Sequence, residues 1–142
     1  MIDKWQERYL DLARLVATWS KDPSTQVGAV LVGRDRRQIA LGYNGFPPGI
    51  ADTADRLADK VRKYQLTQHA ERNVLDNAQF DPEGGLLVVT FHPCVECAKS
   101  IVSKRIGMVM CPKPSDREPW KTSAAVACEL FSEAGVKVVY FD

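Results

Sequence analysis

Two short segments, His69-Ala70-Glu71 and Pro93-Cys94-Val95-Glu96-Cys97, restrict the fold of this chain more than any other part of the sequence. One imidazole and two thiolates make a set of three zinc ligands. A structural zinc site is normally closed by four protein ligands, whereas a catalytic site keeps one position open. The fold is therefore expected to bring the two segments together around a catalytic zinc ion.

The spacing within the segments suits a metal centre at the starts of two helices. Cys94 and Cys97 are three residues apart, so at the start of a helix they fall on nearly the same face. The partial positive charge of a helix N-terminus keeps such thiols ionised. His69 is predicted to open a second helix. Glu71 is predicted to act as a catalytic acid and base, which takes a proton from activated water and hands it to the substrate.

The rest of the chain predicts a three-layer α/β domain. A first helix is expected over residues 4–20, where apolar side chains recur at helical spacing, and residues 52–64 are expected to be partly helical. Helices connect the later strands, so those strands should be parallel, after an initial antiparallel hairpin. The other predicted helices cover 69–80, 94–104 and 120–134, with Gly135 as the final cap, and the predicted strands cover 27–32, 39–43, 86–90, 106–110 and 136–141. No repeat or linker divides the chain, so residues 1–142 are expected to form a single domain.

The composition argues against several classes of partner. Lys and Arg number 19 and Asp and Glu number 18, and this net charge of +1 does not favour a nucleic-acid surface. No stretch approaches the roughly 20 apolar residues that cross a bilayer, so no membrane contact is expected. The two cysteines beside Pro93 have metal-binding spacing, which favours a reducing, cytoplasmic setting. Cys111 and Cys128 are expected to be small buried hydrophobic residues.

The two metal segments match the H-x-E…P-C-x-x-C signature of zinc deaminases. At these residues the chain resembles the cytidine and deoxycytidylate deaminase superfamily, and specifically its dCMP deaminase branch. The segments that carry the resemblance are residues 20–30 (SKDPSTQVGAV), 42–47 (GYNGFP), 69–73 (HAERN) and 93–99 (PCVECAK). Together they extend from about residue 20 to 105, and the C-terminal third matches only in outline.

The resemblance implies a cytidine-deaminase-like fold, with a five-stranded mixed sheet flanked by helices. It also implies one catalytic Zn²⁺ per chain and conversion of dCMP to dUMP with release of ammonia. Asn44 is expected to contact the substrate sugar, and the backbone amide of Ala70 is expected to help bind the pyrimidine.

The resemblance also bears on regulation. Gly42, Tyr43, Asn44 and Gly45 resemble a segment that, in regulated members, contributes to a site for activation by dCTP and inhibition by dTTP. The alternative is that the glycines simply make a tight turn. Regulated members are oligomers, so a homo-oligomer is expected here, either a dimer or a hexamer.

The sequence leaves two interpretations open for each of His92, Trp120 and the charged residues 60–63. His92 either lies near the substrate or faces solvent. Trp120 either covers the substrate base, because aromatic faces stack well on pyrimidines, or packs the last helix. The charged residues 60–63 form a solvated face, unless Arg62 or Lys63 approaches a phosphate.

Two alternatives to dCMP deamination also stay open. The first keeps the chemistry and changes the substrate to a tRNA adenosine, cytidine or dCTP, although the near-neutral charge argues against tRNA. The second is a non-catalytic nucleotide-binding regulator that retains zinc for stability. Glu71 argues against the regulator, because a structural metal does not need a carboxylate beside an open position.

Overall fold

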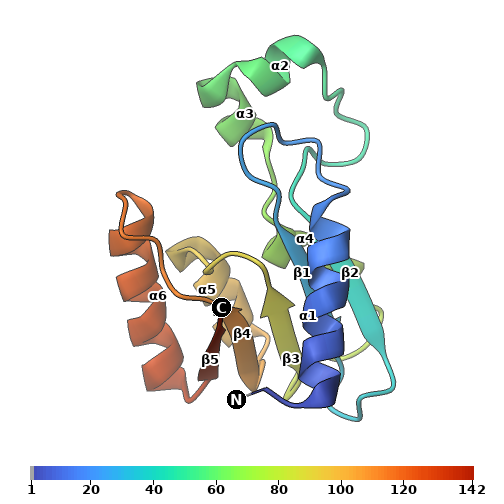
Figure 1. The fold of residues 1–142 in the computed structure, drawn as a ribbon, viewed down its shortest axis with the longest axis vertical. Coiled ribbons are helices and arrows are strands. Elements are labelled where there is room, and N and C mark those ends of the chain that lie inside the picture. Colours follow the sequence, from blue (N-terminus) through green and yellow to red (C-terminus); the bar gives the residue numbers. More distant parts are fainter. Residues whose placement is uncertain (1) are drawn as a thin grey trace.

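The computed structural model describes residues 2–142 and contains one mixed five-stranded sheet with the strand order β2-β1-β3-β4-β5 (Figure 1). The strands are β1 (Gly28–Val32), β2 (Ile39–Tyr43), β3 (Leu86–Val89), β4 (Met108–Pro112) and β5 (Lys137–Phe141). The helices are α1 (Lys4–Ala17), α2 (Ala54–Ala58), α3 (Lys60–Leu66), α4 (Ala70–Asn77), α5 (Val95–Ser103) and α6 (Trp120–Ala134). Within this described range, no helix has the length and apolar character that a membrane crossing requires.

The strand directions confirm the predicted topology. β1 and β2 form an antiparallel hairpin, and β1 also pairs antiparallel with β3. β3, β4 and β5 are parallel to one another, as expected for strands that are joined through helices. The partial helix expected over residues 52–64 is confirmed by α2 and α3, and Gly135 caps α6 in the left-handed conformation with φ 78°.

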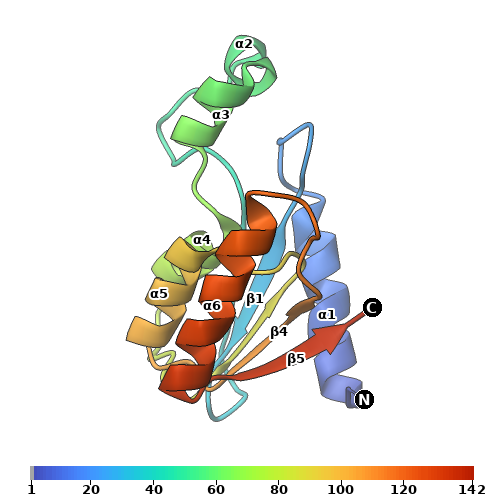
Figure 2. The ribbon, with the colours of Figure 1, turned by 90° about the vertical axis from the view of Figure 1, so that its left-hand side faces the viewer.

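Helices cover both faces of the sheet, which makes the predicted three layers. α1 lies on one face, and α4, α5 and α6 lie on the other (Figure 2). Successive side chains of a strand point to opposite faces. Ala29 and Leu31 of β1 therefore pack with α4, α5 and α6, whereas Val30 and Val32 pack with α1. The continuous apolar run of β1 reflects this burial on both faces.

The fourth strand was predicted two residues too early, over 106–110. Arg105 has a left-handed backbone with φ 57°, and the Ile106 amide donates back to the Ile101 carbonyl at 3.4 Å. These features make a Schellman-type end to α5, so Ile106 completes the helix terminus although it is apolar and buried. Pairing with β3 begins only at Met108.

Two helices also end earlier than predicted. The amides of Thr18, Trp19 and Ser20 bond to carbonyls three residues back, so the chain after Ala17 continues as a tighter 3₁₀-type turn. The helix predicted to reach residue 80 ends at Asn77, whose side-chain amide donates to the Leu41 carbonyl at 2.9 Å. This bond ties the end of α4 to β2.

Gly42 lets α4 lie directly on β2. A Cβ atom at Gly42 would lie 2.4 Å from the Val74 nitrogen and 2.8 Å from the Ala70 carbonyl oxygen. Both atoms belong to the backbone of α4, which cannot move aside as a side chain can. The glycine therefore fixes how closely the start of α4 approaches the sheet.

Replacement of Gly42 with alanine is expected to lower the free energy of unfolding by about 1–3 kcal/mol, the usual cost of overpacking. Urea denaturation of the zinc-saturated protein measures this loss. Gly45→Ala is the matched control, because a Cβ at Gly45 meets nothing within 4 Å. The control is expected to stay within about 0.5 kcal/mol of the parent. Equal stabilities of the two variants would contradict the packing argument.

Residues 46–68 form an arm that stands above the end of the sheet in both ribbon views (Figures 1 and 2). The arm carries α2 and α3, which pack against each other. A single β-bridge between Gly45 and Gln68 joins its two ends. α2 has no buried residue, and α3 has one, Lys63.

Candidate metal centre and active site

The structure brings His69, Cys94 and Cys97 together, as predicted. The Nδ1 atom of His69 lies 3.5 Å from the Cys94 sulfur and 3.4 Å from the Cys97 sulfur. A tetrahedral zinc with Zn–N of about 2.0 Å and Zn–S of about 2.3 Å needs N···S separations of about 3.5 Å. The three side chains therefore fit one zinc ion. Their ligand atoms all lie within 4.8 Å of one another.

Two helix starts position these ligands. His69 is the N-cap of α4 and makes no side-chain capping bond there, and its imidazole instead faces the two sulfurs. Cys94 is the N-cap of α5, and its sulfur accepts the Cys97 amide at 3.5 Å. Cys97 follows in the first turn of the same helix. Both helix N-termini thus direct their partial positive charge toward the thiolates.

The thiols have opposite pKa shifts because they share one hydrogen bond. The Cys97 thiol donates to Cys94 and, with help from His69, lowers the pKa of Cys94 to about 4. The same bond and burial raise the pKa of Cys97. This arrangement favours the thiolate form of Cys94, which suits a cation-binding site.

Glu71 lies in the first turn of α4, two residues after His69, and is buried. Its carboxyl group is not part of the metal-ligand cluster but lines the cavity beside it. Burial raises the pKa of Glu71 against the opposing attraction of His69. A buried carboxyl group beside a metal centre is well placed to exchange protons with a bound substrate.

A cavity of about 320 Å³ opens over the metal centre. Phe91 and Trp120 form part of its wall, with ring centroids 6.5 Å apart in an edge-to-face arrangement. Trp120 thus begins α6 and also lines the cavity, so helix packing alone is not its role. Ser115 and Arg117, from the loop between β4 and α6, line the same cavity. Neither residue is predicted from the sequence, because a polar proline-rich loop gives no sign of the direction in which it folds.

His92 is buried and lines the cavity, so the solvent-facing interpretation was wrong. Its Nδ1 atom lies 3.0 Å from the Pro93 carbonyl oxygen, and its Nε2 atom lies 3.7 Å from the Cys128 sulfur. Cys111 is fully buried, as expected, but Cys128 is only half-buried. Cys128 therefore behaves as a partner of His92 at the edge of the core.

Asn44 and Ala70 both line the cavity. The Asn44 side chain is already engaged with the backbone, since its oxygen accepts the Val27 amide at 2.8 Å and its nitrogen donates to the Thr25 carbonyl at 2.9 Å. One N–H and one lone pair of Asn44 remain for a ligand. Asn44 therefore shapes the loop before β1, and its predicted contact with a sugar remains a prediction.

Three of the four residues predicted to bind effectors line a second cavity, and the fourth does not. Tyr43, Asn44 and Gly45 line a second, smaller cavity of about 130 Å³, together with Trp19 and residues of the arm. Gly42 does not line this cavity. The close approach of α4 explains why position 42 is a glycine.

Residues 60–63 had two interpretations, a solvated face or an approach of Arg62 or Lys63 to a phosphate. Residues 60–62 are exposed, as on a solvated face, but the solvated-face interpretation was wrong for Lys63, which is buried. Lys63 is 2% exposed, and its ammonium group forms an ion pair with Asp22 at 2.9 Å. Both residues line the main cavity. No pattern in residues 60–66 marks Lys63 as buried, because its partner lies in a distant loop.

Sequence comparisons assign the chain to a known group. The family profile described as "Cytidine and deoxycytidylate deaminase zinc-binding region" matches residues 3–113. The chain is 42% identical to an uncharacterized deaminase encoded in the luxG 3' region of Aliivibrio fischeri, over 99% of this chain and 95% of the relative. It is 37% identical to the deoxycytidylate deaminase of Mus musculus, over 94% of this chain and 77% of the relative.

Solved structures share the fold. The dCMP deaminase of the cyanophage S-TIM5, solved in complex with dCMP and dUMP, superimposes with a TM-score of 0.79 at 23% identity, over 99% of each chain. This similarity confirms the cytidine-deaminase-like fold expected from the sequence. Since the family profile covers most of the chain and includes all three clustered metal ligands, the chain belongs to the cytidine and deoxycytidylate deaminase family.

Proposed function

We propose that this chain is a zinc-dependent hydrolase that converts dCMP to dUMP and ammonia. The observation that supports this most is the convergence of His69, Cys94 and Cys97 beside the buried carboxyl group of Glu71. Three protein ligands leave a zinc position open for catalysis. The similarity to the Mus musculus deoxycytidylate deaminase supports a cytosine nucleotide as the substrate.

In the proposed mechanism, His69, Cys94 and Cys97 would hold a zinc ion, which would supply the Lewis acidity that lowers the pKa of water toward about 7. Glu71 accepts a proton from the attacking water through its carboxylate. Glu71 then donates that proton to the N3 atom of the cytosine ring. It also helps to transfer the second proton of the same water to the exocyclic nitrogen, which leaves as ammonia. Water adds its oxygen at C4 and ammonia leaves, so a carbonyl replaces the exocyclic amine.

Substrate recognition is proposed to divide between the two sides of the cavity. The aromatic wall of Phe91 and Trp120 suits a flat pyrimidine. Ser115 and Arg117 offer a hydroxyl and a guanidinium group, which suit a phosphate. Asn44 is proposed to contact the sugar, and the Ala70 amide is proposed to bind the base.

The test is a panel of cytidine, deoxycytidine, CMP, dCMP and dCTP, with ammonia release as the readout and a tRNA adenosine substrate included. We expect dCMP to have the highest kcat/KM, because it alone combines a deoxyribose with a single phosphate. A higher kcat/KM for cytidine or for tRNA would contradict the substrate assignment. No ammonia from any member of the panel would favour a non-catalytic regulator.

We also propose that residues 1–142 act as one deaminase domain in a cytoplasmic homo-oligomer, a dimer or a hexamer, that binds no nucleic acid or membrane. Free cysteines support a reducing compartment, and exposed Trp5 and Leu15 on α1 support contacts between subunits. The second cavity is proposed to receive dCTP or dTTP as effectors. Light scattering with and without these nucleotides, and the same panel assayed in their presence, test both statements.

A further inference from the structure

One buried charged side chain joins the arm to the loop before β1. Helices normally bury apolar side chains, but α2 buries none and α3 buries only Lys63. The side chain of Lys63 is 3% exposed and that of its partner Asp22 is 9% exposed, with 2.9 Å between nitrogen and oxygen. Within α2 and α3, burial of apolar side chains therefore contributes little to the position of the arm, and the Lys63–Asp22 pair is their buried contact with the loop before β1.

Asp22 lies in a loop that is built to receive the lysine. One carboxylate oxygen accepts the amides of Ser24 at 2.8 Å and Thr25 at 3.1 Å and also the Lys63 ammonium. Burial opposes ionisation of Asp22, but the bonds from Lys63 and the two amides outweigh it and lower its pKa. Asp22 is therefore an anion in the wall of the cavity.

The ion pair connects the arm to the cavity wall. The next residue of α3, Tyr64, and Thr67 at the end of α3 both line the cavity. On the other side, the Thr25 carbonyl accepts the Asn44 side chain, so the loop that holds Lys63 also holds Asn44. A shift of Lys63 would move Tyr64 and Thr67 away from Asn44 and open the cavity.

We propose that Lys63 is a positioning residue, whose buried ion pair with Asp22 latches the arm over the cavity and sets substrate affinity. The latch acts on binding and leaves the proton transfers to Glu71, which lies on α4 and not on the arm. A second pair, Lys21 with Asp52, joins the same loop to the same arm at 3.0 Å, but its side chains are 69% and 41% exposed. Exposed pairs contribute little, whereas removal of one partner from a buried pair is costly.

Enzyme kinetics test the latch, and this experiment rests on the proposed deamination of dCMP. Asp22→Asn keeps one oxygen that can accept the Ser24 and Thr25 amides and removes the negative charge that faces Lys63. Lys63→Met keeps the aliphatic stem and removes the ammonium. In each variant we expect KM for dCMP to rise by about 30-fold or more, the lower end of the cost of breaking a buried charge pair, with kcat within about twofold of the parent. Asp52→Asn is the matched control and should keep the parental KM.

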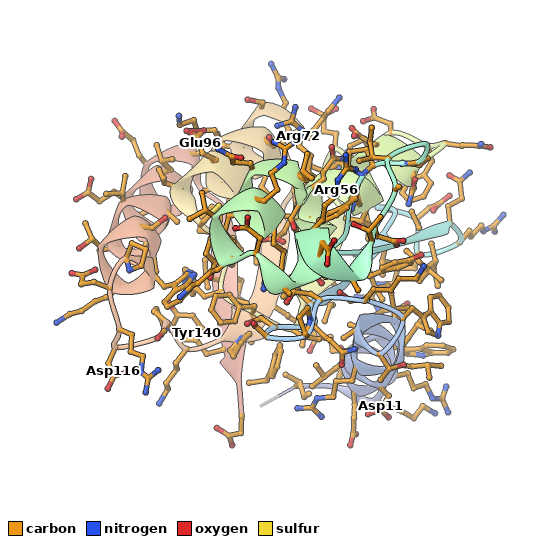
Figure 3. All side chains as sticks on the ribbon, turned by 90° about the horizontal axis from the view of Figure 1, so that it is seen from above. Asp11, Arg56, Arg72, Glu96, Asp116 and Tyr140 are labelled. Carbon is orange, nitrogen blue, oxygen red and sulfur yellow. The ribbon has the colours of Figure 1, made fainter. Side chains whose placement is uncertain are left out.

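Limited proteolysis tests the latch without reference to activity. Arg56, Lys60 and Arg62 are trypsin sites on the arm, and Figure 3 shows Arg56 on the arm as seen from above. Asp22→Asn and Lys63→Met should be cleaved at these sites about tenfold faster than the parent, because local opening of the arm becomes cheaper. Asp52→Asn should be cleaved at the parental rate, and mass spectrometry identifies the sites.

The double variant Asp22→Asn/Lys63→Met keeps the test decisive if a single variant unfolds, because it leaves no unpaired buried charge. Its KM and cleavage rate should not exceed those of the worse single variant, which is the non-additivity expected of one shared interaction. Parental cleavage rates in all three variants would overturn the latch, as would a fall in kcat with unchanged KM. A parent that releases no ammonia from dCMP would refute the proposed function and leave the proteolysis to decide the latch.

Discussion

Replacement of Glu71 with glutamine is expected to lower kcat for ammonia release by about 100- to 10 000-fold, the contribution of a positioned acid and base. Glutamine has the same shape but cannot take a proton from water or return one to the substrate. The variant should keep about one zinc ion per chain, because the clustered ligand atoms belong to other residues. Metal analysis and steady-state kinetics on the same preparation measure the two quantities.

Glu96→Gln is the matched control for this change. Glu96 lies between the two cysteine ligands in the sequence, yet its side chain is 73% exposed and pairs with Lys99. Figure 3 shows Glu96 on α5 as seen from above. Its replacement should leave kcat within about twofold of the parent, as for most surface changes away from a site. If Glu71→Gln stayed as active as Glu96→Gln, the assignment of the proton shuttle to Glu71 would be wrong.

The metal centre was predictable because local chemistry specifies it. Cys94 and Cys97 need only the start of one helix to share a face, and His69 and Glu71 need only the start of another. The single long-range requirement was that the two starts meet, and parallel strands joined by helices bring such starts to the same edge of a sheet. For this reason the ligand set and the strand directions could be read from spacing and periodicity.

The arm and its latch could not be predicted in this way. Burial of Lys63 depends on a partner 41 residues away along the chain, and a helix of seven residues with four charged or polar positions is typical of a solvated surface. The start of β4 was mispredicted for a different reason, since the apolar Ile106 serves the end of α5 and not the strand. A tertiary contact decided how Lys63 is used, whereas the local end of a helix decided how Ile106 is used.

Replacement of Cys94 with alanine is expected to remove zinc and to destabilise the fold together, because metal binding and folding are coupled. Cys94 provides a ligand sulfur and also caps α5 by accepting the Cys97 amide, so one change removes both functions. At zinc a thousandfold above its dissociation constant, the lost linkage is about 4 kcal/mol. A loss of this size lowers Tm by roughly 10 °C in a domain of this length.

Thermal unfolding with added zinc and with chelator measures this loss: the parent should show the shift between the two conditions, and the variant should show almost none. Cys128→Ala removes a thiol outside the cluster and should keep the parental zinc content and zinc-dependent shift. A full zinc complement in Cys94→Ala would exclude Cys94 as a ligand, and with it the three-ligand centre on which the proposed chemistry depends.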